Sequence, residues 1–233
     1  MNIEFFRDYS AMSVHGASIV IEELRKKPNL LLCASTGNSP SGLYEELTRK
    51  AKSEKTLFQQ IKIVKLDEWI GLGKNSKGTC EYYLRKKVIK PLEISEDRYL
   101  SFDSLTTDPA KDCKRIQFEL QKHDPIDLCV LGLGTNGHIG FNEPGAFVQA
   151  QCHVAQLASK TQHHGMIAGE TVSPKYGMTL GMGDILSAKK IIMLVSGEGK
   201  DMARESLFTT KITTQCPASF LWLHSNVECL VVR

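Results

Sequence analysis

Residues 127–145 have the sequence DLCVLGLGTNGHIGFNEPG, an apolar run that leads directly into a glycine-rich loop. The run from Asp127 to Leu131 is typical of a strand that is covered on both faces. Five glycines in the following fourteen residues let the backbone turn sharply and approach a ligand closely. We therefore expect the loop at the carboxyl end of a strand, where open α/β sheets bind ligands.

His138 and Glu143 are the candidate chemical groups of this loop. A carboxylate that holds one imidazole nitrogen fixes the tautomer and leaves the other nitrogen available for proton transfer. The same two residues also fit a loop histidine that a glutamate holds for structural reasons. Spacing alone leaves both interpretations open.

Apolar runs and amphipathic segments alternate along the rest of the chain. This alternation predicts an α/β fold: a doubly wound, mostly parallel sheet with helices on both faces, a Rossmann-like arrangement in three layers. The chain has 233 residues, 42% of them hydrophobic, and no linker, so we expect one domain over residues 1–233. The expected strands are 30–33, 61–66, 99–102, 127–131, 191–195, 220–223 and 229–232, and the expected helices are 10–27, one from about 43, 80–90, 113–122 and 201–208.

A small polar loop, residues 34–42, separates the first apolar strand from the next helix. Free backbone N–H groups at a helix N-terminus, aided by hydroxyl groups, favour an anion such as phosphate. The alternative, compatible with binding, is that Ser39 caps the helix with Pro40 at its first position. The loop is not a Walker A motif. The candidate binding residues are Ser35, Thr36, Gly37, Asn38 and Ser39.

Three further polar residues follow predicted strands. Asp67 is a candidate general base and Glu68 a candidate ligand contact, although paired acids at a strand end also cap the next element or stay solvated. Lys200 precedes a predicted helix, where it can pair with a phosphate or be one solvated lysine among many. The loop 71–78 is a lid or a connector.

Composition narrows the choice of partners. A net charge of +3 is too small to indicate nucleic-acid binding, whereas a small anionic ligand fits. The seven cysteines form no C-x-x-C pair, and His153, His163 and His164 lack a supporting ligand pattern, so we expect no disulfide framework and no metal site. The N-terminus does not resemble a signal peptide and no segment is apolar enough to span a membrane, which predicts a cytoplasmic protein without membrane contact.

Together these motifs resemble the glucosamine-6-phosphate deaminase/isomerase family, and within it most of all the galactosamine-6-phosphate isomerase branch. The resemblance covers nearly the whole chain. It rests on four segments in the family's order: residues 34–40, 66–69, 134–144 and 196–200.

The resemblance implies an aldose–ketose isomerisation with loss of the C2 amine, without an organic cofactor. The expected reaction converts galactosamine 6-phosphate to tagatose 6-phosphate and ammonia. By resemblance, Asp67 moves the C2 proton, His138 assists ring opening and Glu143 holds His138. Lys200 and residues 35–41 bind the phosphate, and the further substrate contacts are Glu68 and Gly137.

Two positions depart from the family pattern. Asn136 stands where the family usually has an aspartate, which removes a negative charge beside His138 but keeps residue 136 among the candidate catalytic positions. Gln162 stands where glucosamine-specific members use an arginine for phosphate, in agreement with the galactosamine branch.

Three alternatives stay open. They are a glucosamine-6-phosphate deaminase, a 6-phosphogluconolactonase and a non-catalytic sugar-phosphate sensor. Asp67 followed by Glu68 and Trp69 argues against the lactonase, and the absence of a DNA-binding segment argues against the sensor. The sequence leaves the oligomeric state open, a homo-oligomer included, along with any allosteric effector.

Overall fold

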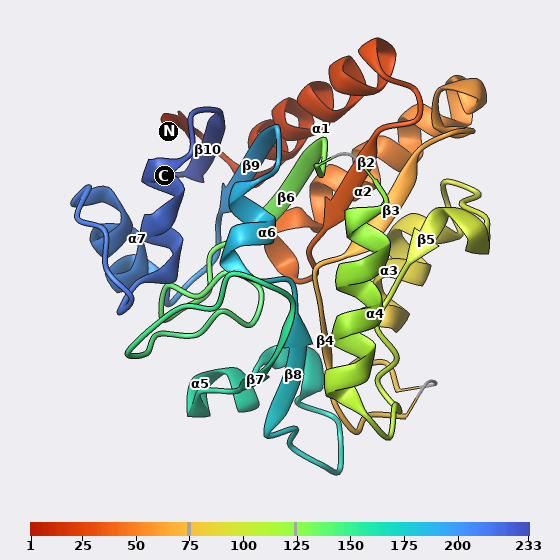
Figure 1. Cartoon of the computed structure of the whole chain (residues 1–233). Helices are drawn as coiled ribbons and strands as arrows, with labels where there is room; N and C mark the ends of the chain where they lie inside the picture. Colours follow the sequence, from red (N-terminus) through yellow and green to blue (C-terminus); the bar gives the residue numbers. More distant parts are fainter. Residues whose placement is uncertain (74–75, 124) are drawn as a thin grey trace.

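The computed structural model describes residues 1–73, 76–123 and 125–233 and builds them around a seven-stranded sheet (Figure 1). The strand order is β1-β10-β9-β6-β2-β3-β5, and every neighbouring pair is parallel. The strands are β1 (Asn2–Phe6), β2 (Leu31–Ala34), β3 (Lys62–Lys65), β5 (Tyr99–Leu100), β6 (Leu128–Gly132), β9 (Lys190–Val195) and β10 (Val227–Val232).

Helices cover both faces of this sheet (Figure 1). Successive side chains of a strand point to opposite faces, so Leu32 packs in one core cluster and Cys33 in the other. The predicted doubly wound, three-layer fold is therefore confirmed. One face carries α1 (Tyr9–Lys26), α2 (Asn38–Ser53), α3 (Cys80–Leu84) and a π-helical turn (Arg85–Ile89), and the other carries α4 (Pro109–Gln121), α6 (Met182–Leu186) and α7 (Asp201–Phe208).

A second, antiparallel sheet of three short strands stands beyond the carboxyl edge of the main sheet. It has the order β4 (Asp67–Trp69), β8 (Tyr176–Thr179), β7 (His153–Gln156), with Thr179 opposite both Asp67 and His153. Between β7 and β8 lie α5 (Ser159–Gln162) and a 3₁₀ turn, η4 (Gly165–Ile167). The sequence does not predict this sheet, because strands of three or four residues show too little alternation of polar and apolar side chains to be distinguished from a loop.

Other local predictions were also wrong. Residues 220–223 belong to a 3₁₀ helix, η5 (Pro217–Leu223), and β1 was missed. The helix α2 begins at Asn38 with Gly37 at its N-cap, so Ser39 lies inside the helix and does not cap it. Of the predicted lid loop 71–78, residues 74 and 75 lie outside the described residues. The remaining short helices are η1 (Lys55–Phe58) and η3 (Glu96–Arg98).

The longest helix, α1, agrees with its prediction. Its inner face buries Met12, Ala17, Val20 and Leu24, and Asp8 accepts a hydrogen bond from the backbone N–H of Ala11 as its N-cap. Across the three described ranges, no helix is long and apolar enough to cross a membrane. That residues 1–233 form one domain stays a prediction.

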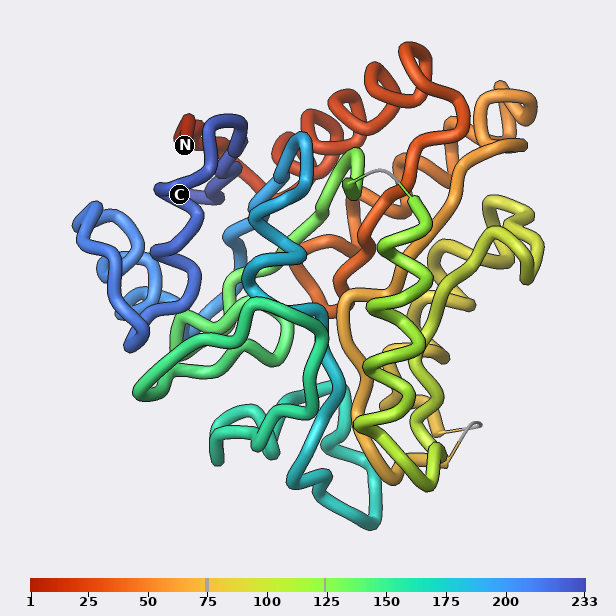
Figure 2. Tube along the Cα trace, in the orientation of Figure 1, coloured from red at the N-terminus to blue at the C-terminus, as the bar shows by residue number. Residues whose placement is uncertain are grey.

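The direction of winding changes at β2. From β2 the chain continues to β3 on one side, and β6 then pairs on the other side, with Ala34 opposite Val130 (Figure 2). The loops that follow β2 and β6 therefore diverge at the same edge of the sheet. Ligands of open α/β sheets bind in the crevice at such a switch point.

Candidate active site

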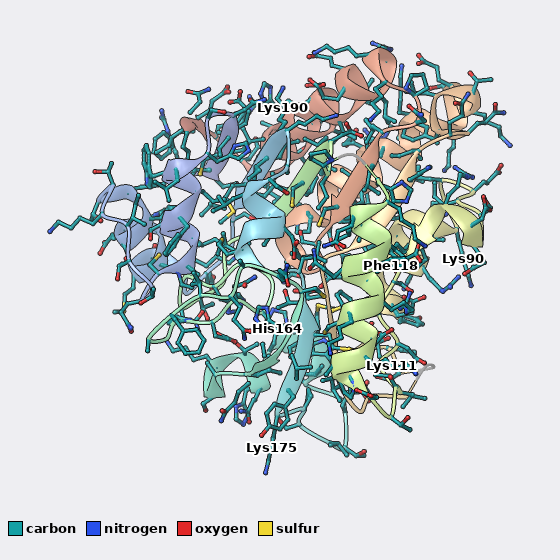
Figure 3. The ribbon with its side chains drawn as sticks, viewed as in Figure 1. Lys90, Lys111, Phe118, His164, Lys175 and Lys190 are labelled. Atoms are coloured by element: carbon teal, nitrogen blue, oxygen red, sulfur yellow. The ribbon has the colours of Figure 1, made fainter. Side chains whose placement is uncertain are left out.

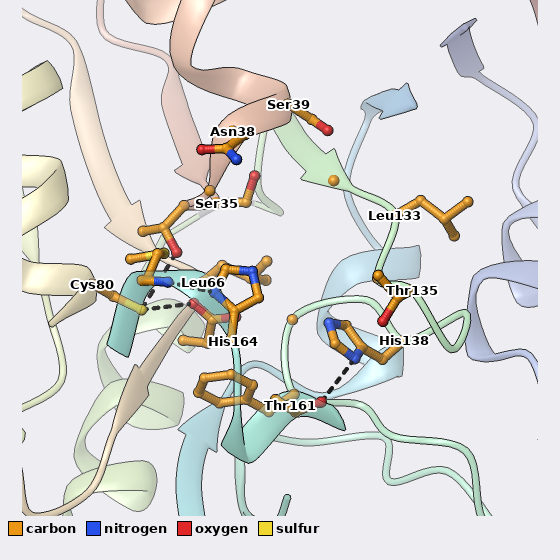
Figure 4. A pocket seen from close by; sticks show the side chains of 18 of the residues that line it. Ser35, Asn38, Ser39, Leu66, Cys80, Leu133, Thr135, His138, Thr161 and His164 are labelled. Carbon is orange, nitrogen blue, oxygen red and sulfur yellow. Dashed lines mark hydrogen bonds between the residues drawn. The ribbon is translucent and has the colours of Figure 1, made fainter. Parts of the chain in front are cut away.

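A pocket opens at this switch point, between the loops that follow β2 and β6 (Figure 4). The sheet topology explains how distant segments meet here, since parallel strands deliver their carboxyl ends to one edge. Eight of the candidate site residues line the pocket: Ser35, Thr36, Gly37, Asn38, Ser39, Asp67, His138 and Lys200. Asn136 and Glu143 stand behind His138, while Glu68 and Gly137 are not part of the lining.

Asp67 is a buried carboxyl group at the floor of the pocket, with 7% of its surface exposed. Burial and the neighbouring charge of Glu68 raise its pKa from 3.8 to about 7, against smaller lowering effects of Cys80, His138 and Lys65. A carboxyl group with this pKa can accept and return a proton near neutral pH. This environment suits the general base that the sequence suggested.

Glu68 does not contact the pocket, contrary to the prediction of a ligand contact. It is fully buried, and its Oε2 accepts a hydrogen bond from Lys65 Nζ at 2.7 Å. Its Oε1 accepts from the backbone N–H of Trp69 and of Cys80, at 2.9 and 3.0 Å. A carboxylate that is neutralised and bonded in this way has a structural task, the attachment of β4 to the start of α3.

Lys65 completes this buried ion cluster. Its Nζ also lies 2.8 Å from Glu81 Oε2 and donates to the carbonyl oxygen of Phe102 at 3.0 Å. Burial acts to lower the pKa of Lys65, but the carboxylates of Glu68 and Glu81 outweigh it, so the pKa lies above its usual value. The lysine therefore stays charged inside the protein.

His138 stands on the other side of the pocket with one ring nitrogen engaged. Its Nδ1 lies 3.3 Å from Glu143 Oε2. It also lies 3.3 Å from Thr161 Oγ1, a contact that Figure 4 marks. Within the described ranges, Nε2 has no hydrogen-bond partner and is left for a ligand. Such an arrangement holds the ring and frees one nitrogen for proton transfer.

Asn136 acts on Glu143 rather than on the imidazole ring. Its Nδ2 donates to Glu143 Oε2 at 2.8 Å, and its Oδ1 accepts from the backbone N–H of His138 at 3.2 Å. Burial acts to raise the pKa of Glu143, but His138, Thr161 and Asn136 together lower it to about 2. Glu143 is therefore an anion at any physiological pH.

Two glycines give the loop after β6 its shape. Gly137 has φ +86°, and a Cβ at this position would lie 2.8 Å from Cys216 Sγ. Gly140 has φ +56°, and a Cβ there would lie 2.8 Å from Thr179 Oγ1. Both positions combine a left-handed backbone with close packing, which only glycine meets without strain. Gly137 thus shapes the loop and does not line the pocket.

The end of the pocket beside α2 is suited to an anion. The N-cap Gly37 provides no side-chain cap, so the first N–H groups of α2 remain available. Lys200 Nζ lies 3.0 Å from Ser39 Oγ, which in turn accepts from Ser196 Oγ at 3.1 Å. Burial lowers the pKa of Lys200 to about 8, a cost that a bound anion would offset.

One wall of the pocket, formed by α5, η4 and the residues between them, was not predicted from the sequence. The residues of this wall that line the pocket are Lys160, Thr161, His164 and Met166. In Figure 3, His164 lies toward the middle of the molecule and Lys175 at its margin. Gln162 turns away, and its Nε2 donates to the carbonyl oxygen of Leu157 at 2.7 Å. No local motif marks such residues, because tertiary packing alone brings this segment to the pocket.

The floor contributes Cys80, Trp69 and Phe141, none of which the sequence marked as a candidate site residue, although Trp69 and Phe141 lie in the segments that carry the family resemblance. The rings of Trp69 and Phe141 pack with centroids 4.6 Å apart, and the ring of His164 lies 6.4 Å from that of Trp69. His164 Nδ1 accepts a hydrogen bond from the backbone N–H of Met166. Among the described residues, no three histidine, cysteine or acidic side chains gather as metal ligands.

Comparison with known proteins gives consistent relatives. Residues 10–231 match the model of a family described as glucosamine-6-phosphate isomerases/6-phosphogluconolactonase. A protein of Escherichia coli (strain K12) named "Putative deaminase AgaI" is 42% identical over 226 residues, which cover 96% of this chain and 89% of the relative. A glucosamine-6-phosphate deaminase of Bacillus velezensis is 34% identical over 233 residues, which cover 99% and 97%.

Solved structures agree with these relatives. A monomeric glucosamine-6-phosphate deaminase, described as a missing link of the NagB superfamily, has a TM-score of 0.93 and 32% identity over 100% of this chain and 98% of that one. A 6-phosphogluconolactonase from Trypanosoma brucei has a TM-score of 0.78 and 19% identity over 99% and 95%. At that identity the second likeness concerns the fold alone.

Proposed function

The chain belongs to the family of glucosamine-6-phosphate isomerases and 6-phosphogluconolactonases, and we propose that it converts galactosamine 6-phosphate to tagatose 6-phosphate and ammonia. Its general activity is that of an amino-sugar-6-phosphate isomerase and deaminase. One observation carries the proposal. A single pocket holds a buried carboxyl group of raised pKa, an imidazole backed by a carboxylate, and a lysine beside an open helix N-terminus.

These groups divide the reaction between them. His138, held through Nδ1, uses Nε2 to move a proton between the C1 hydroxyl and the ring oxygen, which opens the sugar ring. Asp67 then removes the proton from C2 and returns it to C1, while a proton passes from the C2 amine to the oxygen on C1, so that the aldehyde becomes an alcohol and the amine an imine. Water adds to C2 of the imine, ammonia leaves, and the ketose 6-phosphate remains.

The phosphate would lie at the other end of the pocket, at Lys200 and the start of α2. This contact is remote from the reacting carbons and is present in ground state and transition state alike. Its contribution is to bring C1 and C2 into register with Asp67 and His138. The open N–H groups of α2 and the hydroxyl of Ser39 support this orientation.

Gln162 supports galactosamine over glucosamine. By resemblance, glucosamine-specific members place an arginine for phosphate there, whereas the amide of Gln162 is bonded to the backbone of Leu157. The names of several relatives favour glucosamine 6-phosphate, which makes this epimer the competing substrate.

The test is a side-by-side assay of ammonia release from the two amino-sugar phosphates, with ketose 6-phosphate measured in parallel. We expect a higher kcat/KM for galactosamine 6-phosphate. A preference for glucosamine 6-phosphate would reassign the substrate within the same chemistry. Release of ammonia from neither sugar, together with hydrolysis of 6-phosphogluconolactone, would replace the proposal with the lactonase.

A further inference from the structure

The carboxylate of Asp67 has an unusual hydrogen-bond partner. Within the described residues, its side chain accepts one hydrogen bond, from Cys80 Sγ to Oδ1 at 3.5 Å (Figure 4). The same sulfur lies 3.4 Å from Thr36 Oγ1. Cys80 is 2% exposed and lines the pocket, so the thiol lies between the proposed base and a hydroxyl of the β2–α2 loop.

The position of this thiol is set by Glu68, the residue next to Asp67. Besides its bonds to Trp69 and Cys80, Glu68 accepts from the backbone N–H of Glu81 at 2.8 Å. One buried carboxylate thus attaches the strand that carries Asp67 to the first turn of the helix that carries Cys80. These attachments bring the sulfur within reach of the carboxyl group of Asp67, and the weak S–H donor then contacts one of its oxygens.

We propose that Cys80 is a positioning residue for Asp67, which holds one carboxylate oxygen through a weak S–H donor and leaves the carboxylate basic. The inference rests on the proposed role of Asp67 as the base. A carboxylate without any donor would be free to rotate, while a strong donor would stabilise the anion and weaken the base. A thiol is a weak donor, so it restrains the geometry at little cost in basicity.

The other charged groups that face Asp67 stay in place when Cys80 is changed. Glu68, in the same strand, raises the pKa of Asp67, whereas His138 from the β6 loop and Lys65 from β3 lower it. The hydrogen bond from Cys80 also lowers it. Replacing the thiol therefore changes one of these contributions and keeps the rest.

The first experiment compares the pH profiles of kcat/KM for the wild type, Cys80→Ala and Cys80→Ser. Loss of the donor in Cys80→Ala should move the acidic limb upward by about half to one pH unit, the effect of one weak hydrogen bond. The limb of Cys80→Ser, which keeps a donor, should lie below that of Cys80→Ala. Cys113→Ala removes an equally buried thiol outside the pocket and should keep the wild-type limb.

The second experiment needs no substrate. The infrared S–H stretching band of Cys80, identified by its loss in Cys80→Ala or Cys80→Ser, should move to higher frequency when Asp67 becomes protonated, because the acceptor weakens. In Asp67→Asn the band should not respond to pH. A wild-type band that ignores pH, or a Cys80→Ala limb that stays or moves down, overturns the positioning role.

Failure of this inference and failure of the proposed function give different results. If the wild type releases ammonia but either the limb or the band fails to respond as described, only the role of Cys80 is wrong. If the wild type releases ammonia from neither amino sugar, the proposed function is wrong, and the positioning role falls with it.

Discussion

Asn136 donates a hydrogen bond to Glu143, the carboxylate that holds His138, with 2.8 Å between Nδ2 and Oε2. The departure from the family pattern at residue 136 therefore acts on Glu143 and on the backbone of His138. An amide at this position lets Glu143 stay ionised without a second negative charge beside it.

The first prediction concerns Asn136→Asp. The substitution places two carboxyl groups at hydrogen-bond distance, so one proton is shared and the pKa of Glu143 should rise from about 2. Carboxyl-carbon NMR titration measures this rise directly. Asn136→Ala, which removes the donor without adding charge, should give a smaller rise. A Glu143 resonance that titrates alike in Asn136→Asp and the wild type would show that the two side chains do not interact.

The second prediction is that Asp67→Asn abolishes proton exchange at C2 while substrate still binds. The amide fills the same space but cannot accept the proton. Solvent deuterium in the recovered sugar phosphate reports the exchange. Asp184→Asn, a change at a partly buried carboxyl group outside the pocket, is the matched control and should exchange normally. Exchange at the wild-type rate in Asp67→Asn would remove Asp67 from the mechanism.

The third prediction is that the same Asp67→Asn variant is more stable than the wild type at pH 8. Burial raises the pKa of Asp67 from 3.8 to about 7, so the folded state carries a penalty of about 2–4 kcal/mol once the group is ionised. The penalty is absent below pH 4 and complete above pH 7. Urea unfolding at pH 8 and pH 4 should therefore show a gain in stability that disappears at the lower pH. An equal gain at both values would mean that ionisation is not its cause.

The fourth prediction concerns Lys200. Burial lowers its pKa to about 8. Above that pH the amine of the free enzyme is neutral and attracts the phosphate of the substrate less strongly, so kcat/KM should fall. In Lys200→Arg the guanidinium stays charged and this alkaline limb should disappear. Lys175→Gln, at an exposed lysine outside the pocket, should keep it. A limb that persists in Lys200→Arg belongs to another group.

The fifth prediction concerns the buried ion cluster. Lys65→Met leaves Glu68 buried without its cation, which should lower the free energy of unfolding by about 3–5 kcal/mol. Lys62→Met, on the same strand but partly exposed, should change it by less than about 0.5 kcal/mol. Denaturant unfolding of the two variants measures the difference. Equal effects would show that the cluster is not a special contributor to stability.

The sequence predicted most reliably those elements whose side chains are buried on both faces. The run from Leu128 to Leu131 is fully buried, and this burial is why it appears in the sequence as an unbroken apolar segment. The sequence also predicted the loops at the switch point, because glycines and polar residues directly follow these buried strands. Asp67, His138 and Lys200 were found for this reason.

The residues that were missed depend on contacts between distant segments. Cys80 reaches Asp67 because Glu68 attaches the start of α3 to β4, and Thr161 reaches His138 from α5, in the connection between β7 and β8. The prediction that Glu68 contacts the ligand was wrong, because the sequence does not show that an acid at a strand end is paired with a buried lysine, here Lys65. Neither propensity nor periodicity contains this information.

Thr179 gives the small sheet a further importance. It pairs with Asp67 in β4 and with His153 in β7, and its hydroxyl accepts a hydrogen bond from the backbone N–H of Phe141, next to the loop of His138. The distance between the carboxyl group of Asp67 and the imidazole ring of His138 therefore depends on one short strand, β8. Residues 157–175, which form one wall of the pocket, connect β7 to β8. Within this segment Thr161 contacts His138 and Ala158 donates to Glu143, so these two positions belong to the reacting groups. The other residues of the wall can change to admit a different sugar while Asp67 and His138 keep their spacing.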